Sequence, residues 1–168
     1  MRKDGAVFDH IAGLPAHPLA VHVPVVMIPL TALIALLYVL LPRWRRSFRW
    51  WLLAGAAVSS ASAWFATQTG ERLERSLGSA VNIERHQEFG TRTFWWSLAL
   101  LIAAIALLLV EHRRVRGAHA DAVAPQHNHT MWRVTSALLC VALLGLAAVT
   151  VTYVILTGHS GAEMVWVD

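Results

Sequence analysis

Two histidines and two prolines open the first long apolar run of this sequence, in the stretch His17-Pro18-Leu19-Ala20-Val21-His22-Val23-Pro24. Imidazole is a common ligand of metal ions and of haem iron, and an ionisable side chain is costly at the entrance to a membrane span. Two further histidines, His86 and His159, lie just outside later apolar runs. The rest of the chain must position these four imidazoles.

The apolar runs predict a membrane protein. Of the 168 residues 57% are hydrophobic and only 14% are charged, and a helix needs about 20 apolar residues to cross a bilayer. We expect a single transmembrane domain over residues 1–168, with spans at about 18–41, 50–66, 93–110 and 134–156. The expected fold is all-α, an integral membrane four-helix bundle with antiparallel up-down topology.

Three connections join these spans. We expect a tight loop at 42–49, a hydrophilic connection at 67–91 whose last part from Ile83 is helical, and a solvated loop at 111–133. The loops 42–49 and 111–133 contain eight of the fourteen basic residues, and basic residues in short loops mark the cytoplasmic side. We therefore expect both termini on the outer, periplasmic or extracellular, face of a bacterial inner membrane.

Four crossings bring His17, His22, His86 and His159 to the same face. Bis-histidine haem b needs imidazoles from facing helices, whereas one zinc or copper ion needs three or four ligands. His17 and His22 are five residues apart, about 140° around an ideal helix, so they do not form a simple chelating pair. The alternative is that the imidazoles only anchor the helices through hydrogen bonds.

Other side chains support or limit these interpretations. The neighbours expected to hydrogen-bond to the imidazoles are Glu71, Glu84, Glu88 and Ser160. The span 50–66 is rich in alanine, glycine and serine, which allows close helix packing or leaves room for a flat cofactor. One cysteine, Cys140, excludes an internal disulfide, and we see no hydrolase, transferase or phosphate-loop motif. The basic residues flank apolar spans, so we do not expect nucleic acid as a partner.

Four ordered motifs resemble a known family. They are His-Pro-Leu-x-x-His-x-Pro at 17–24, Thr-Gly-Glu at 69–71, Glu-Arg-His-Gln-Glu-x-Gly at 84–90 and Gly-His-Ser-Gly-Ala at 158–162. Together they are similar, from about Phe8 to Trp166, to a bacterial four-helix membrane family catalogued as the domain of unknown function 2231. The resemblance implies a likeness to small membrane cytochromes with one or two haems, and some members are joined to Rieske iron–sulfur domains. The family's motif histidines correspond to His17, His22, His86 and His159.

The sequence thus favours a haem b-binding membrane electron-transfer protein with its histidine cluster on the outer face. Its partners would be a quinone or a redox protein such as a separate Rieske protein. The alternatives are a membrane protein that binds zinc or copper through the same residues, and a cofactor-free accessory subunit. A redox subunit is the only enzymatic role that the sequence suggests.

Overall fold

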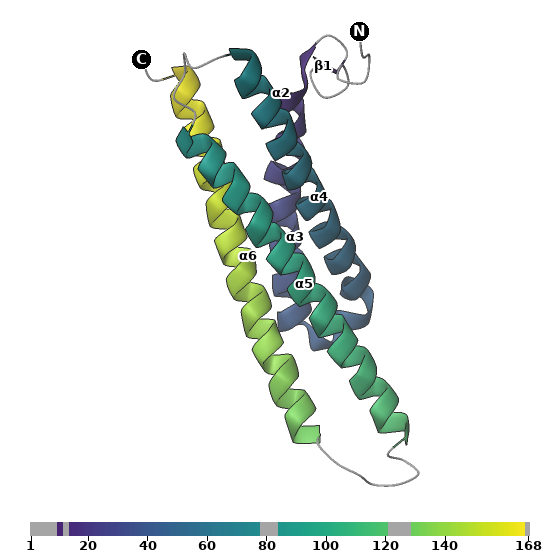
Figure 1. The fold of residues 1–168 in the computed structure, drawn as a ribbon. Helices are drawn as coiled ribbons and strands as arrows, with labels where there is room; N and C mark the ends of the chain where they lie inside the picture. Colours follow the sequence, from purple (N-terminus) through teal and green to yellow (C-terminus); the bar gives the residue numbers. More distant parts are fainter. Residues whose placement is uncertain (1–9, 12–13, 78–83, 121–128, 167–168) are drawn as a thin grey trace.

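The computed structural model describes residues 10–11, 14–77, 84–120 and 129–166. Four long helices lie side by side (Figure 1). They are α3 (His22–Leu40), α4 (Arg45–Leu77), α5 (Glu84–Ala120) and α6 (His129–Trp166). The short elements are the paired strands β1 (His10–Ile11) and β2 (Leu14–Pro15), the helix α2 (Ala16–Ala20) and the 3-10 helix η2 (Pro42–Trp44). Apart from one two-residue strand pair, the described chain is all-helical, as predicted.

Three of the described helical segments are long and apolar enough to cross a membrane. They are His17–Leu40, Glu84–Arg113 and Thr130–Glu163, and they match the predicted spans 18–41, 93–110 and 134–156. Their outward side chains are large and apolar, as lipid contact requires; Val141, for example, is 70% exposed. The predicted span 50–66 lies inside α4, where serines, glycine and alanines lower the hydropathy. Its crossing of the membrane stays a prediction.

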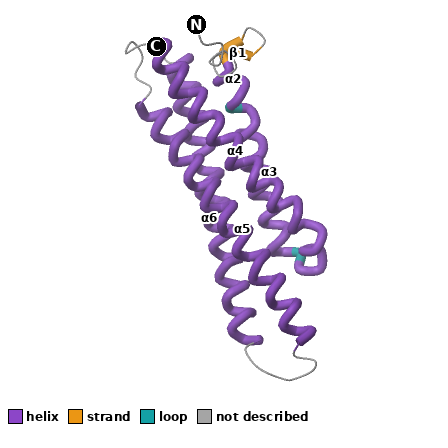
Figure 2. Tube along the Cα trace, turned by 45° about the vertical axis from the view of Figure 1, so that its right-hand side comes forward, coloured by secondary structure: helices purple, strands orange, loops and turns teal. Residues whose placement is uncertain are grey.

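The first apolar segment is broken near its start. Pro24 has no N–H to donate to the carbonyl of Ala20, so the helical ladder cannot continue unchanged through this turn. The break is a single turn residue, Val21, which separates α2 from α3 and appears as a short loop in Figure 2, although its φ of −68° and ψ of −21° are still helical. The backbone N–H of Val21 still donates to the carbonyl of His17, at 3.1 Å. His17 therefore lies in α2 and His22 begins α3, on either side of Val21.

The long helices extend beyond the predicted spans, which corrects the expected loops. Most of the predicted connection 67–91 is helical, because α4 continues to Leu77 and α5 begins at Glu84. In the same way, α5 and α6 take up most of 111–133, and η2 and the start of α4 make up 42–49. Ion pairs between side chains four residues apart, such as Glu71 with Arg75 at 3.4 Å, stabilise helical turns in water.

We call the end of the molecule that carries α2 the histidine end, and the end that carries η2 the arginine end. Towards the arginine end the core is an apolar cluster of Leu, Ala, Tyr and Cys side chains that includes Leu52, Leu100, Leu107 and Leu143. Nearer the histidine end, each long helix instead buries hydroxyl groups. These are Thr31, Ser59, Ser60, Thr69, Thr93, Ser97, Thr150 and Ser160. The core is therefore apolar towards the arginine end and contains hydroxyl groups nearer the histidine end.

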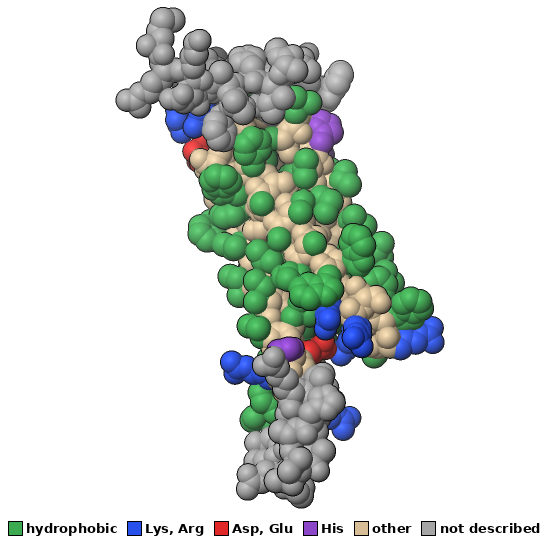
Figure 3. Space-filling view, turned by 90° about the vertical axis from the view of Figure 1, so that its right-hand side faces the viewer, with side chains coloured by type: hydrophobic (Ala, Val, Ile, Leu, Met, Phe, Trp, Pro, Cys, Tyr) green, Lys and Arg blue, Asp and Glu red, His purple; other side chains and the backbone are tan. Residues whose placement is uncertain are grey.

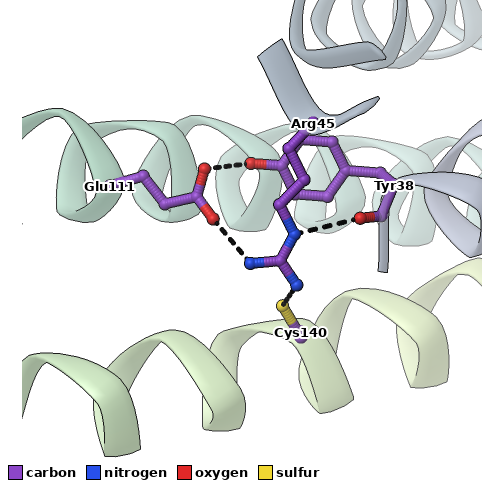
Figure 4. Close-up of polar contacts among 4 residues, drawn as sticks. All are labelled: Tyr38, Arg45, Glu111 and Cys140. Carbon is purple, nitrogen blue, oxygen red and sulfur yellow. Dashed lines mark hydrogen bonds and ion pairs between the residues drawn. The ribbon is translucent and has the colours of Figure 1, made fainter. Parts of the chain in front are cut away.

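A polar cluster ties the helices together at the arginine end (Figure 4). The hydroxyl of Tyr38 in α3 donates to the carboxylate of Glu111 in α5. Arg45, the first residue of α4, pairs with the same carboxylate at 3.1 Å and donates to the carbonyl of Tyr38 at 3.1 Å. Its other terminal nitrogen lies 3.9 Å from Sγ of Cys140 in α6. Glu111 is three-quarters buried, so this cluster supplies the partners that a buried charge needs.

Candidate functional site

His17 is anchored to α4 through one ring nitrogen. Its Nδ1 lies 3.1 Å from the carbonyl oxygen of Ala66 and 3.3 Å from Oγ1 of Thr69. A carbonyl oxygen only accepts hydrogen bonds, so Nδ1 must carry the proton. The hydroxyl of Thr69 donates to the backbone carbonyl of Ala66 at 3.0 Å, which leaves its lone pair to accept from the imidazole. Nε2 is then the nitrogen of His17 that is left to bind a ligand.

His86 repeats this arrangement on α6. Its Nδ1 lies 3.0 Å from the carbonyl oxygen of Thr157 and 3.1 Å from Oγ of Ser160. Ser160 donates to the carbonyl of Thr157 at 3.0 Å, as Thr69 does to that of Ala66. In both anchors the hydroxyl follows the carbonyl residue by three positions. His86 therefore also carries its proton on Nδ1 and leaves Nε2 for a ligand.

A glycine completes each anchor one residue after the hydroxyl. A Cβ atom added to Gly70 would stand 3.1 Å from Cε1 of His17, and one added to Gly161 would stand 3.1 Å from Cε1 of His86. Both distances are shorter than the 3.5–4.0 Å at which carbon atoms pack best. Each imidazole thus lies directly against the backbone of the neighbouring helix, and any side chain larger than that of glycine would push the ring away by a few tenths of an ångström.

The two imidazoles meet beside one cavity at the histidine end. Their ring centroids are 6.1 Å apart and their planes are almost perpendicular, at 88°. The cavity has a volume of about 530 Å³, within the usual range for small-molecule and cofactor sites. Its lining comes from α2, α3, α4, α5 and α6 and is mostly apolar. Glu74 and Gln87, which also line it, are joined by a hydrogen bond of 2.8 Å between α4 and α5.

The structure brings together two of the four predicted histidines and places the other two on the surface. His22 is exposed, and its Nδ1 donates to the carbonyl of Pro18 at 2.6 Å. That carbonyl lies one turn before the break in the helix. His159 is also exposed, and its Nε2 lies 3.1 Å from a carboxylate oxygen of Glu163. Neither His22 nor His159 lines the cavity of His17 and His86.

The predicted supporting residues divide in the same way. Ser160 contacts His86 directly, and Glu71 lines the cavity while it pairs with Arg75. Glu88 is exposed and pairs with Arg92, and Glu84 is the exposed first residue of α5. Thr69, Gly70 and Gly161 belong to the family motifs, but they were not predicted to have a role beside the histidines. The sequence does contain a pattern common to both anchors, in which a hydroxyl residue and a glycine follow the carbonyl residue by three and four positions: Ala66-x-x-Thr69-Gly70 and Thr157-x-x-Ser160-Gly161.

The model of one family, described as a predicted membrane protein (DUF2231), matches residues 13–168. The chain belongs to this family. The predicted resemblance is thereby confirmed, and the three apolar helical segments agree with the description of DUF2231 as a membrane protein. No curated protein and no solved structure matches the chain.

The DUF2231 site can be compared with what each predicted cofactor needs. Haem iron receives four nitrogens from its porphyrin and takes one or two ligands from the protein, so two imidazoles complete its coordination. A bare zinc ion takes four ligands, of which at least three come from the protein. Among the residues whose side chains the structure describes, no group of three or more His, Cys, Asp or Glu is placed to hold an ion. Two imidazoles equal the number of protein ligands that a haem iron can take.

Proposed function

We propose that this DUF2231 protein binds haem b through His17 and His86 and transfers electrons at one face of a bacterial inner membrane. The observation that carries the proposal is the pair of matching anchors. Each imidazole gives its Nδ1–H to a backbone carbonyl and a hydroxyl of the neighbouring helix, and Nε2 is free to bind iron. Such partners hold the ring in one tautomer and orientation and make the ligating nitrogen more basic.

Several features of the cavity support haem as the occupant. The two imidazoles come from different helices, α2 and α5, and their ring planes are 88° apart. The lining is mostly apolar, and Gly70 and Gly161 let the two imidazoles pack against the helix backbones that border the cavity. When bound, haem supplies one-electron chemistry whose potential depends on its axial ligands, their hydrogen bonds and its burial. A quinone or a separate redox protein such as a Rieske protein would be the electron partner.

The same proposal includes the arrangement in the membrane. We infer a four-helix bundle with antiparallel up-down topology in which α4 also crosses, because one side of it buries small residues such as Ala56 and Ala63 against the other helices. On the same helix Ser59 is fully buried and bonds to Thr31 at 3.1 Å. Small and hydroxyl-bearing residues are typical of helix contacts in membranes. The arginine-rich loops favour a cytoplasmic arginine end, which puts the histidine end and both termini on the outer face.

A metal ion is the second candidate. Glu71 and Glu74 line the cavity beside His17 and His86, and two imidazoles with carboxylate oxygens are ligands that zinc and copper accept. Movement of these side chains would be needed, because they do not form an ion-binding group as they stand.

An absorption spectrum tests both candidates. Protein purified from cells supplied with ample haem should show a Soret band that shifts on reduction with dithionite. His17→Ala and His86→Ala should each abolish the band, whereas His159→Ala, matched in residue type and on the same end of the molecule, should keep it. A colourless wild-type protein would refute haem binding. Elemental analysis of that preparation would then detect about one zinc or copper ion per chain if the second candidate holds.

A further inference from the structure

Four arginines surround the start of α4: Arg43 in η2 and Arg45, Arg46 and Arg49 in α4 itself. Only Arg45 is neutralised by a carboxylate among the described residues, through its ion pair with Glu111. Arg43 and Arg46 are exposed. The guanidinium of Arg49 lies over the ring of Trp50, 5.2 Å from the ring centroid, and its Nε is buried with no hydrogen-bond partner in the described part of the chain.

The remaining arginines occur at every third position, 43, 46 and 49. Residues three apart on a helix are surface neighbours, so Arg46 and Arg49 lie on one side of α4 with Arg43 in the turn before it. Figure 3 shows basic side chains gathered near one end of the described surface, next to large apolar side chains. The backbone places three positive charges within about two turns of chain.

The start of a helix is an unfavourable place for positive charge, because its unpaired N–H groups already carry the positive end of the helix dipole. The first turn of α4 contains no acidic residue that would offset this charge. Arg43, Arg46 and Arg49 thus add to a positive charge that no carboxylate of the described chain offsets.

The surroundings of these arginines indicate which kind of anion would bind there. Trp44 is 51% exposed and Trp50 is 63% exposed, and tryptophan with arginine is typical of the headgroup level of a bilayer. On the membrane side, Leu36 and Leu40 of α3 are also exposed and apolar. A ligand that joins a phosphate to long apolar chains would match both parts of this surface.

We propose that Arg43, Arg46 and Arg49 form a binding site for the phosphate headgroup of an anionic phospholipid. Trp44 and Trp50 border the headgroup, and the acyl chains lie along the exposed apolar side of α3. Arg45 takes no part, because Glu111 already neutralises it. The site lies at the opposite end from His17 and His86, and it does not depend on any cofactor there.

Native mass spectrometry of the full chain tests this proposal. The protein is extracted from nanodiscs that contain equal amounts of phosphatidylglycerol and phosphatidylcholine, and the retained lipid is counted. We expect retained phosphatidylglycerol, with its affinity lowered about fivefold for each arginine replaced in the series Arg43→Gln, Arg46→Gln and Arg49→Gln. The matched control is the double variant Arg113→Gln with Arg133→Gln, which removes two exposed arginines of α5 and α6 near the same end. This control should retain lipid as the wild type does.

Three results would overturn the proposal. Equal loss of lipid in the control would mean that a diffuse surface charge attracts the lipid. Equal retention of phosphatidylcholine would mean that the headgroup is not selected. Displacement of the lipid by millimolar inorganic phosphate would mean that the site takes a free anion. Each arginine is replaced singly before all three are replaced together, and circular dichroism checks that every variant is folded. The single variants therefore decide the outcome if the triple variant does not fold. None of these measurements depends on haem.

Discussion

Replacement of Gly70 or Gly161 by alanine should damage the histidine site without damaging the fold. The new Cβ atom would stand 3.1 Å from Cε1 of His17 or of His86, so each ring must move by about 0.4 Å or more to reach ordinary carbon contact. The hydrogen bond from Nδ1 of His17 to Ala66, now 3.1 Å, would then exceed the usual limit of about 3.2 Å. The anchor would be lost while the helices stay in place.

Two opposing energies keep the overall stability nearly constant. The loss of one hydrogen bond costs about 1 kcal/mol, and alanine in place of a helical glycine gains about 0.5–1 kcal/mol. Cofactor affinity should respond far more strongly, because loss of a partner that orients a ligating histidine typically costs about 10–100-fold. The control is Gly145→Ala in α6, where an added Cβ has no atom within 4 Å. This variant should gain stability and bind the cofactor as the wild type does.

The assay combines haem titration with ¹⁵N NMR of histidine-labelled protein. In the wild type, His17, His86 and His22 should each carry a proton on Nδ1, and this proton should exchange slowly with solvent in His17 and His86, which are partly buried, but rapidly in the exposed His22. Gly70→Ala should change the signals of His17 alone, and Gly161→Ala those of His86 alone. The reasoning is refuted if both variants keep the wild-type ring signals and cofactor affinity, or if Gly145→Ala alters them equally.

Two further predictions concern the exposed histidines and the polar cluster. His22→Ala should retain the cofactor but lower the thermal midpoint slightly, because the carbonyl of Pro18 loses its partner at the break in the helix; loss of the Soret band would instead place His22 among the iron ligands. Glu111→Ala should destabilise the protein by about 1.5–3 kcal/mol in detergent, because it removes an ion pair and the hydrogen bond from Tyr38 and leaves Arg45 without a carboxylate. Circular dichroism melts measure this effect, which should exceed that of Tyr38→Phe, and equal midpoints for the two variants would contradict it.

The apolar pattern predicted most of the fold. Runs of about 20 hydrophobic residues are typical of membrane-spanning helices, so hydropathy alone located the apolar parts of α3, α5 and α6. The ends of the helices were harder to predict, because 67–77 and 111–120 are rich in charge and were interpreted as loops. In 67–77 the ion pair of Glu71 with Arg75 adds a few tenths of a kcal/mol to the helix, and such a pair is evident only after a helix is assumed.

The histidine site was predictable in outline but not in detail. The five-residue spacing of His17 and His22 correctly indicated that they do not point the same way. Which of them faces inward depends on packing, because His17 contacts Ala66 and Thr69 of α4 whereas His22 is exposed. The acceptors of His17 and His86 are backbone carbonyls, which any residue type provides. The sequence shows only the hydroxyl residue and the glycine that follow each carbonyl, Thr69-Gly70 and Ser160-Gly161.

The apolar cluster around Leu52, Leu100, Leu107 and Leu143 has a consequence for energy conversion. It lies between the hydroxyl-lined half of the core and the charged cluster at the arginine end, and its side chains are hydrocarbon except for the hydroxyl of Tyr38 and the thiol of Cys140, which both contact that charged cluster. A redox group bound beside His17 and His86, as proposed, would be separated from the arginine end by leucine and alanine side chains, and it would exchange its electrons and any accompanying protons at the histidine end. Such chemistry is electrically silent, and by itself it would not charge the membrane.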